Sequence, residues 1–517
     1  MIKRNKFSLS HYKLLSARMG YLIPIQLTEV LPGDTFQMAT SLFIRLAPMV
    51  APVMHPVHVR VHHWYVPTRL IWEDFEDFIT GGPDGLNQSV PPYIVPGGDT
   101  GTGSLSDYLG IPPGQPNIKF SALPFRAYNL IYNEWYRDQD LDAPLKISLA
   151  SGEDSALTTT TDLMRVDWER DYFTTARPWP QKGPAVSVPV NLTAAGEPSI
   201  TAQTTITGNG VPTFLAGAND ARYASALKRA DGSSLNVSQG EQNIVGELAW
   251  VNPALAATTN INFTAGNPEL GSVDINQLRE AFALQRFEEH RALYGSRYTE
   301  YLRFLGIKAS DARLQRPEYL GGGKQTIQFS EVLQTSPTDG SPVGSMAGHG
   351  VGAMRTNRFR RFFEEHGFVM SLMMVQPVAV YQQGLPRMWQ RQVKEDYFQR
   401  ELQHIGQQEV WQSELYATAD NAGNTAESDR AKHMFGYQNR YDEYRWHESS
   451  VAGEFRKLLN YWHMAREFDA PPALNAAFIS GLPTNRIFAA QENDQLYVMA
   501  SHSIQARRAM AKFGNPI

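Results

Sequence analysis

The sequence contains no cysteine. A chain without cysteine forms no disulfide bonds, has no thiolate nucleophile and cannot build a zinc site from thiolate ligands. Any durability that the protein needs outside a cell must therefore come from packing and from contacts between subunits. The same absence suits assembly in a reducing cytoplasm.

Long apolar segments are also missing. The most apolar stretch, 368–381, is too short to cross a bilayer and is interrupted by Gln376 and Pro377. The first six residues include charges but are not followed by an apolar stretch, which predicts that there is no secretory signal peptide. We therefore expect no membrane span and no signal-directed export.

An excess of basic charge is absent as well. The net charge is −5, and charged residues make up 19% of the chain against 42% hydrophobic residues. This composition is typical of a folded globular protein and excludes a globally basic nucleic-acid binder. Contact with nucleic acid would need local basic patches or a separate basic partner. A chain of 517 residues is long enough for two or three domains.

The most informative segment that is present is the run 45–67. It begins with apolar residues and prolines and continues as an alternating strand, in which Val57, Val59 and Val61 face one side and the residues between them the other. Residues 22–36 read as strand, turn and strand. Frequent prolines indicate short, interrupted strands, which favour a β-sandwich over a doubly wound α/β fold.

Helices are predicted in three places between the strands. Apolar residues recur at helical spacing in 123–140, in 274–287 and in 449–462. Trp72, Phe75 and Phe78 predict a further short amphipathic helix. The sequence therefore predicts a mainly β protein with long inserted loops and a few helices.

Residues 185–270 differ from the rest of the chain in composition. They contain nine charged residues in 86, about half the density of the whole chain, and are rich in Thr, Ala, Asn, Gly and Val. We interpret this segment as an inserted subdomain of strands and loops near the surface, and as a candidate recognition face. It divides the remaining chain into 1–184 and 271–517.

Two clusters suggest a metal or catalytic site. The histidines 55, 58, 62 and 63 are close in sequence, but on a strand His62 and His63 point to opposite faces and His58 lies roughly 13 Å from His62, so one ion cannot join them without other ligands. The acidic residues 73, 74, 76 and 77 could hold calcium or act as an acid/base pair, but they also fit the wet side of a short helix. Because no phosphate loop, dinucleotide fingerprint or hydrolase motif is present, we predict no catalytic residue, no metal and no cofactor.

Further blocks follow the opening run in order. The run 45–67 and the aromatic-acidic turn 69–82 are joined by blocks at 7–11, 123–138, 171–183, 313–322, 381–389 and 435–445. Together they resemble the major capsid protein of the Microviridae, which are small icosahedral bacteriophages with single-stranded DNA. The resemblance is strongest to the gokushovirus-like branch of that family.

This resemblance implies a fold and a function. The fold would be an eight-stranded antiparallel viral jelly-roll β-sandwich. The function would be that of a major capsid protein, which self-assembles in the bacterial cytoplasm into a T=1 icosahedral shell around circular single-stranded DNA. Implied partners are copies of the chain, the DNA, a small basic DNA-binding phage protein, a pilot protein and a bacterial surface receptor.

Two basic clusters are candidates for contact with the DNA, through phosphate charge and through stacking on an aromatic residue. The cluster around 355–361 is more basic than the family's pattern. For both clusters the alternative is a solvated surface or a salt-bridged contact between subunits. The clusters consist of Lys3, Arg4, Lys6, Arg507, Arg508 and Lys512, and of Arg355, Arg358, Phe359, Arg360 and Arg361.

Aromatic residues and arginines supply candidate contacts with other proteins. The candidates for the interface between subunits are Trp72, Phe75, Tyr437, Arg440, Tyr441, Tyr444, Arg445 and Trp446, although core packing explains such aromatics equally well. The candidates for host contact, all in the inserted segment, are Phe214, Arg222, Tyr223, Lys228 and Arg229.

Two other functions remain open at this point. A β-sandwich carbohydrate-active enzyme would explain the tryptophans and the paired carboxylates but not the ordered blocks. A secreted carbohydrate-binding adhesin would need a signal sequence, which we do not find. Neither alternative accounts for the whole chain.

Overall fold

The structure is a computed structural model of the full chain. It describes residues 4–84, 86–186, 275–294, 297–307, 310–336, 342–422 and 433–512, and in 187–274 only the backbone of strands. The chain divides into two compact units, of which unit 1 comprises residues 1–184 and 286–517 and unit 2 comprises residues 185–285. Within the described part of the chain, no helix is long and apolar enough to span a membrane.

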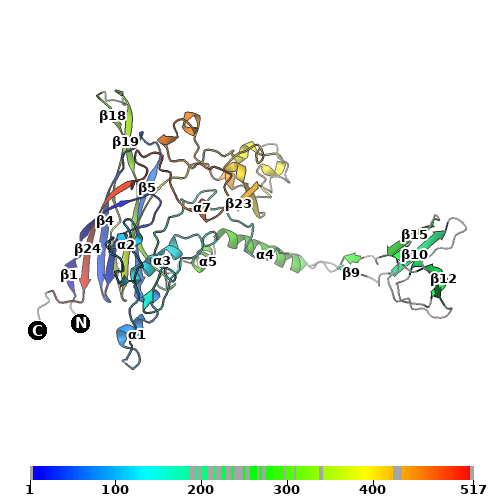
Figure 1. Ribbon diagram of the computed structural model, residues 1–517, viewed down its shortest axis with the longest axis horizontal. Helices are drawn as coiled ribbons and strands as arrows, with labels where there is room; N and C mark the ends of the chain where they lie inside the picture. The colour runs from blue at the N-terminus through cyan, green and yellow to red at the C-terminus, as the bar shows by residue number, and fades with distance from the viewer. Residues whose placement is uncertain are drawn as a thin grey trace. The chain divides into compact units, whose positions relative to one another are not determined.

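Unit 1 is built on two antiparallel sheets, shown as neighbouring layers of arrows in Figure 1. Among the described residues, the larger sheet has seven strands in the order β1-β24-β4-β19-β18, with β2 also paired to β24 and β20 also paired to β4. Its strands are β1 (Asn5–Ser8), β2 (His11–Ala17), β4 (Thr35–Leu46), β18 (Gln328–Leu333), β19 (Met346–Arg355), β20 (Phe359–Phe362) and β24 (Leu496–Arg508).

The smaller sheet has four strands in the order β17-β5-β21-β3. They are β3 (Ile23–Val30), β5 (Val57–Pro67), β17 (Glu318–Thr326) and β21 (Gly367–Pro377). The predicted strand, turn and strand in 22–36 is confirmed as β3 and β4, joined at Gly33, whose φ of 83° suits a residue without a side chain.

The core lies between the two sheets. Val57, Val59 and Val61 of β5 are fully buried, as their alternation predicts, and pack in one cluster with Ile44 of β4 and Val498 of β24. Because both sheets contribute one apolar face to this cluster, unit 1 is a β-sandwich. The prediction of a mainly β, antiparallel fold with few helices is confirmed.

A second core lies on the other side of the smaller sheet, beneath helix α3 (Leu123–Trp135). Phe125, Tyr128 and Ile131 of α3 are buried against Trp64 of β5 and Leu372 of β21. This helix confirms the prediction for 123–140, and α1 (Phe75–Thr80) confirms the predicted short helix. The connections that carry these helices also include α2 (Leu105–Leu109) and the short strands β6 (Tyr93–Ile94), β7 (Phe120–Ser121) and β8 (Glu153–Asp154).

The predicted helix in 449–462 is wrong. The structure has two short 3-10 helices there, η7 (Gly453–Arg456) and η8 (Asn460–Trp462). Leu458 between them is exposed, so the apolar residues do not form one buried stripe. Nearby, strands β22 (Gln407–Trp411) and β23 (Met434–Asn439) pair beside a third core around Phe173, Tyr381 and Phe435.

Unit 2 contains strands that pair among themselves. β10 (Ser199–Ile206) pairs with β15 (Ala257–Thr264), and β16 (Pro268–Leu270) with β9 (Leu192–Ala194). β11 (Phe214–Leu215), β12 (Tyr223–Lys228), β13 (Ser234–Val237) and β14 (Ala249–Trp250) form one sheet.

Two helices follow the strands of unit 2 in the chain. Helix α4 (Ile275–Tyr294) confirms the predicted helix up to Phe287, and α5 (Tyr298–Phe304), which belongs to unit 1, comes after it.

Candidate DNA-contact and assembly surfaces

One face of the seven-stranded sheet is turned away from the core. In β4, Phe36, Met38, Leu42 and Ile44 point into the sandwich and are buried, so the odd-numbered residues of the strand point outward. Residues directly opposite each other in neighbouring strands share a face. The strand registers therefore assign each residue of this sheet to its inner or outer face.

The outer face brings the two predicted basic clusters together. Lys6 of β1 lies opposite Arg507 of β24, Arg507 lies opposite Thr35 of β4, and Thr35 lies opposite Phe362 of β20. Arg360, two residues before Phe362, occupies the same face. Segments that are far apart in the sequence thus form one basic surface at one end of the sheet, where β1 and the end of β24 lie side by side (Figure 1).

Arg4 extends this basic surface toward β20. Its guanidinium carbon lies 5.3 Å from the centroid of the Phe362 ring, and its Nη1 donates a hydrogen bond to the carbonyl oxygen of Gly33 at 3.0 Å. The cation is therefore held over an exposed aromatic ring on the outer face. Arg355 lies on the same face, opposite Ser41, and Arg358 is exposed in the turn between β19 and β20.

Three of the predicted DNA-contact residues belong to the inner face instead. Arg508 Nε lies 3.0 Å from Oδ2 of the buried Asp34, and Arg361 lies 3.0 Å from Glu318 of the other sheet. The Phe359 ring packs 5.5 Å from the ring of the buried His63, so it is not placed to stack on a base. In the sequence, each basic cluster could be read as one surface. Because side chains alternate along a strand, the fold places some members of each cluster on the outer face and others on the inner face.

The remaining members of these clusters are at the ends of the chain. Lys512 is exposed and Lys3 lies outside the described residues.

The sequence did not point to Phe362 as an outward aromatic residue. The prediction named Phe359 instead, which lies on the opposite face of the same strand. Arg361, next to Phe362, lies opposite Phe36 of β4, which is buried in the core. Phe362 must therefore point to the other side, which is the outer face.

The predicted interface residues divide into buried and exposed groups. Trp72 is only 2% exposed, packs against the rings of Phe75 and Phe78, and donates from Nε1 to Ser151 Oγ at 2.8 Å. Tyr441 is equally buried. Both side chains therefore serve the core of the single chain and leave little surface for a second subunit.

Exposed aromatics lie next to them in sequence. Tyr444 is 49% and Trp446 52% exposed, and Arg445 is exposed between them while its guanidinium pairs with Asp442 at 2.8 Å. The other three predicted residues, Phe75, Tyr437 and Arg440, are partly buried. Trp446 also lines a cavity of about 610 Å³ that includes Trp389, itself exposed.

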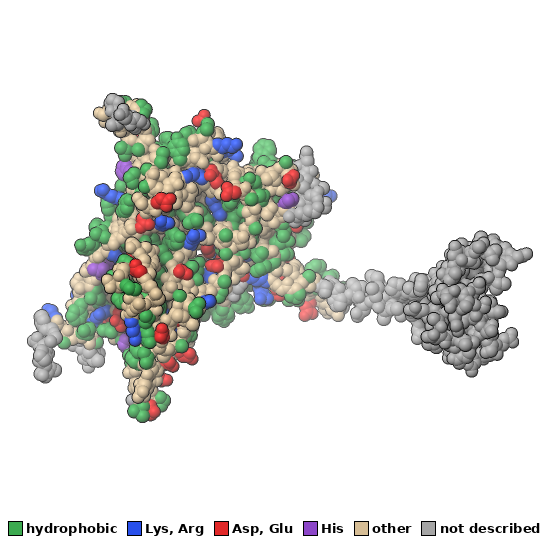
Figure 2. Space-filling view, viewed as in Figure 1, with side chains coloured by type: hydrophobic (Ala, Val, Ile, Leu, Met, Phe, Trp, Pro, Cys, Tyr) green, Lys and Arg blue, Asp and Glu red, His purple; other side chains and the backbone are tan. Residues whose placement is uncertain are grey.

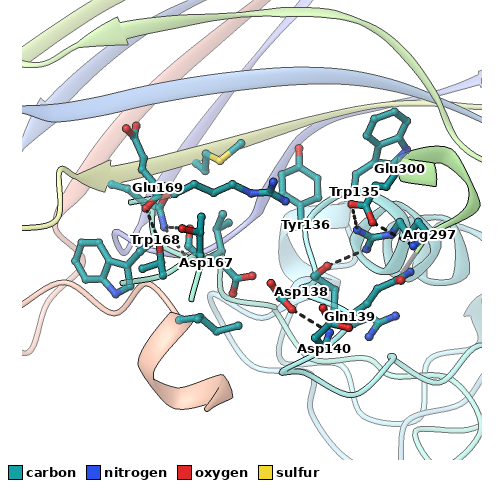
Figure 3. A pocket seen from close by; sticks show the side chains of 18 of the residues that line it. Trp135, Tyr136, Asp138, Gln139, Asp140, Asp167, Trp168, Glu169, Arg297 and Glu300 are labelled. Carbon is teal, nitrogen blue, oxygen red and sulfur yellow. Dashed lines mark hydrogen bonds and ion pairs between the residues drawn. The ribbon is translucent and has the colours of Figure 1, made fainter. Parts of the chain in front are cut away.

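A second cavity, of about 480 Å³, lies between the end of α3, the segment 166–170 and α5 (Figure 3). Its carboxylates are neutralised by cations, since Arg177 lies 2.9 Å from Asp138 and 3.4 Å from Asp140, and Lys182 lies 2.6 Å from Asp140. Arg297 donates hydrogen bonds to backbone carbonyls of α3 and its end. These pairs stabilise the junction of several loops.

Asp167 is the exception in this cavity. Burial, and then the negative charges of Asp138 and Asp142, raise the pKa of Asp167 to about 7. A carboxyl group with such a pKa could exchange protons near neutral pH. The cavity offers it no histidine partner other than His62, whose Nδ1 is engaged with the hydroxyl of Tyr136 at 2.8 Å.

The histidines of β5 are structural. His63 hydrogen-bonds through its two ring nitrogens to Ser371 and Thr356, and burial lowers its pKa to about 3. His55, which precedes β5, likewise contacts a backbone group, the carbonyl oxygen of Val378 at 2.7 Å. Across the described ranges, no three His, Asp or Glu side chains lie close enough together to hold a metal ion.

The predicted host-contact residues all belong to unit 2. Arg222 and Arg229 lie outside the described residues, and for Phe214, Tyr223 and Lys228 only the backbone of β11 and β12 is described.

Comparison with known proteins identifies the family. The family model for "Capsid protein (F protein)" matches residues 1–517. The chain is similar to the capsid protein VP1 of Bdellovibrio phage phiMH2K, with 35% identity over 93% of this chain and 89% of that protein. It is similar to the capsid protein VP1 of Chlamydia phage 1, with 33% identity over 94% and 91%, and to that of Spiroplasma virus 4, with 29% identity over 92% and 88%.

The relatives are virion proteins of Microviridae phages, so the role that the comparison supports is structural and not enzymatic. A mainly β sandwich, charge-paired cavities and an exposed basic sheet face are compatible with that role. The family model covers both units and every block on which the resemblance rests. The chain therefore belongs to the phage capsid (F protein) family and is a capsid protein of a Microviridae-type virion.

Proposed function

We propose that this chain is the major capsid protein of its virion and assembles with copies of itself into a T=1 icosahedral shell around circular single-stranded DNA. The observation that carries the proposal is the strand order of the two sheets. Taking one long strand for each position, the sheets read β2-β24-β4-β19 and β3-β21-β5-β17. In chain order these are strands one, eight, three and six, and strands two, seven, four and five.

An eight-stranded jelly roll would have this order, because in that fold the chain crosses between two antiparallel sheets and its first and last strands pair. The order supports the proposed fold, because β2 pairs with β24 and β3 with β21. The loops between the strands of such a sandwich accept long insertions, which fits the length of the connections here. Exposed aromatic side chains in those loops, such as Trp389 and Trp446, would supply contacts between subunits.

In this proposal the basic end of the larger sheet faces the packaged DNA. Lys6, Arg360 and Arg507 would neutralise phosphate without reading the base sequence. The net charge of −5 leaves most of the DNA charge to other molecules, such as a small basic phage protein. A pilot protein is a further expected partner.

We propose that residues 185–270 form an inserted surface subdomain that contacts a component of the bacterial surface. The separate compactness of 185–285 and the low charge of the segment support this division of labour. Replacing 185–270 by a short Gly/Ser linker should preserve soluble protein and particles but abolish adsorption to host cells. Loss of soluble protein would contradict it.

Packaging is tested on particles purified from phage-producing cells. Particles should contain circular single-stranded DNA that resists nuclease and becomes sensitive when the shell is opened. Charge reversal at Lys6, Arg360 and Arg507 together should lower the amount of protected DNA, with Lys394→Glu as an exposed control on another surface. Unchanged DNA content in the triple variant would contradict the proposed role of the basic end.

A further inference from the structure

The outward positions in the strands of the seven-stranded sheet carry basic but no acidic side chains, as far as these strands are described. The strand pairings identify the outward residues, and within these described strands none of them is Asp or Glu. Cations occupy the same positions, namely Lys6, Arg45, Arg355, Arg360 and Arg507. A protein with more acidic than basic residues thus has no carboxylate at an outward position of these strands. The nearest acidic neighbour that a hydrogen bond identifies is Asp494, which precedes β24 and accepts from the hydroxyl of the outward residue Ser16.

The far end of this face is apolar and aromatic. Tyr12 and Leu14 of β2 are both 68% exposed. Leu14 lies opposite Met499 of β24, which lies opposite Phe43 of β4, and all three are exposed. Together with Tyr497 they surround a shallow hollow of about 430 Å³, which we call the aromatic end of the sheet.

Cations accompany the aromatic end. The guanidinium of Arg45 lies 5.5 Å from the centroid of the Phe43 ring, and Arg355 lies one outward position away from Phe43 along β4, opposite Ser41. Outward positions along a strand are about 6.8 Å apart. Basic and aromatic groups therefore alternate within the reach of a few nucleotides. In the view of Figure 2, the surface of unit 1 as a whole shows basic, acidic and hydrophobic side chains intermixed, so the lack of acidic residues at the outward strand positions is a local feature.

The side chains on this face indicate what kind of ligand it binds. Exposed apolar side chains gathered in one place indicate a binding surface. A ligand that covers both ends must be anionic and must also carry flat apolar rings. Single-stranded nucleic acid has both, because its unpaired bases stack on aromatic side chains while its phosphates pair with Lys and Arg. In a duplex the faces of the bases are covered by their stacked neighbours and cannot stack on the protein.

We propose that the outer face of this sheet is a platform for unpaired nucleobases, with bases on the aromatic end and phosphates on the flanking cations. The inference rests on the proposed function and deepens it. The basic end alone would bind any polyanion, whereas a stacking platform prefers single strands over duplexes and over a backbone without bases. Preference for unpaired bases would then be a property of the capsid protein itself.

The first test uses the unaltered full-length chain as subunits released from particles. Fluorescence anisotropy would measure its affinity for three probes of equal length: an oligo(dT), a duplex and an abasic oligodeoxynucleotide. Stacking of one or two bases predicts oligo(dT) binding about tenfold or more tighter than the abasic probe. Equal affinity for the oligo(dT) and the abasic probe would overturn the platform.

The second test uses matched variants. Tyr12→Ser combined with Tyr497→Ser should remove most of the preference for oligo(dT) but leave binding of the abasic probe unchanged. The control Tyr397→Ser changes a tyrosine that is also about half exposed but lies outside the sheet, and it should change neither. A double variant that keeps the full preference would overturn the inference.

The outcomes separate this inference from the proposed function. Particles with protected DNA, formed by subunits that do not distinguish abasic from natural DNA, would retain the capsid role and refute the platform. If the Tyr12/Tyr497 variant changes the sedimentation of subunits without DNA, the aromatic end is a protein interface, and the platform is also refuted. Absence of protected DNA from particles would instead refute the packaging proposal.

Discussion

Arg126 of α3 and Asp154 of β8 form an ion pair of 2.8 Å in which both side chains are almost wholly buried. Arg126 also donates hydrogen bonds to the carbonyl oxygens of Ile71 and Ala150. The pair therefore ties the connection around α1 and the strand β8 to the helix that covers the smaller sheet. Its guanidinium and carboxylate leave few polar atoms unsatisfied, which a buried pair requires.

The first prediction concerns this pair. Arg126→Met should lower the free energy of unfolding of the isolated chain by about 3–5 kcal/mol, because it leaves the Asp154 carboxylate buried without its cation. Urea unfolding followed by circular dichroism measures the loss. A variant in which both residues are replaced, Arg126→Met with Asp154→Leu, should recover part of it, and no recovery would contradict the pairing argument.

The same pair predicts acid sensitivity. Burial alone would raise the pKa of Asp154, but hydrogen bonds from Thr158, Thr159 and Arg126 together lower it below its usual value. A lowered pKa in the folded state adds stability at higher pH that is lost as the pH falls through that pKa, below about pH 4. Asp154→Asn should flatten this part of the pH dependence of unfolding.

Asp167 predicts the opposite sign. Since burial raises its folded-state pKa to about 7, the folded chain binds a proton there that the unfolded chain has already released. Its contribution to stability is therefore complete below about pH 4, where the unfolded chain is also protonated, and is lost as the pH rises from there to about 7. Asp167→Asn should raise the melting temperature at pH 8 relative to the unaltered chain, and more than at pH 5. An equal effect at both values would contradict the raised pKa.

Two glycines provide a matched pair for backbone strain. Gly20 and Gly33 both have a φ of 83°, but a Cβ at Gly20 would clash with the carbonyl oxygen of Gly481, whereas one at Gly33 would meet nothing within 4 Å. Gly33→Ala should cost about 1 kcal/mol for the left-handed backbone. Gly20→Ala should cost more than about 4 kcal/mol, because backbone must also move. Similar losses in unfolding experiments would contradict the contact.

The aromatic residues of the predicted interface should separate into two classes. Trp72→Ala should destabilise the isolated chain by about 3–5 kcal/mol, because it empties a packed site under α1. Trp446→Ala should leave unfolding nearly unchanged and reduce the yield of particles, measured by sedimentation. The reverse pattern would contradict the division into core and interface residues.

How far the sequence reveals the fold depends on the range of the interactions. The alternation in 57–67 and the helical spacing in 123–135 depend on neighbours along the chain, and both are confirmed. In 449–462 the same spacing misled, because tertiary contacts break the segment into two short turns. The pairing of β2 with β24 joins residues almost five hundred positions apart, and no local pattern encodes it.

The candidate surfaces show the same limit. The basic residues around 355–361 were recognisable in sequence, but which of them face outward depends on the register of β20 on β4. That register turns Phe362 and Arg360 outward and Phe359 inward. Tyr12, Phe43 and Arg45 were missed altogether, since ordinary side chains in separate strands form a surface only when the sheet is assembled.

The most direct measurement is a cryo-electron microscopy reconstruction of particles purified from phage-producing cells. Our account predicts a closed T=1 shell in which each subunit carries the two sheets described here, with Lys6, Arg360 and Arg507 turned toward the interior. Particles that lack icosahedral symmetry, or a shell in which this basic sheet face points outward, would contradict it.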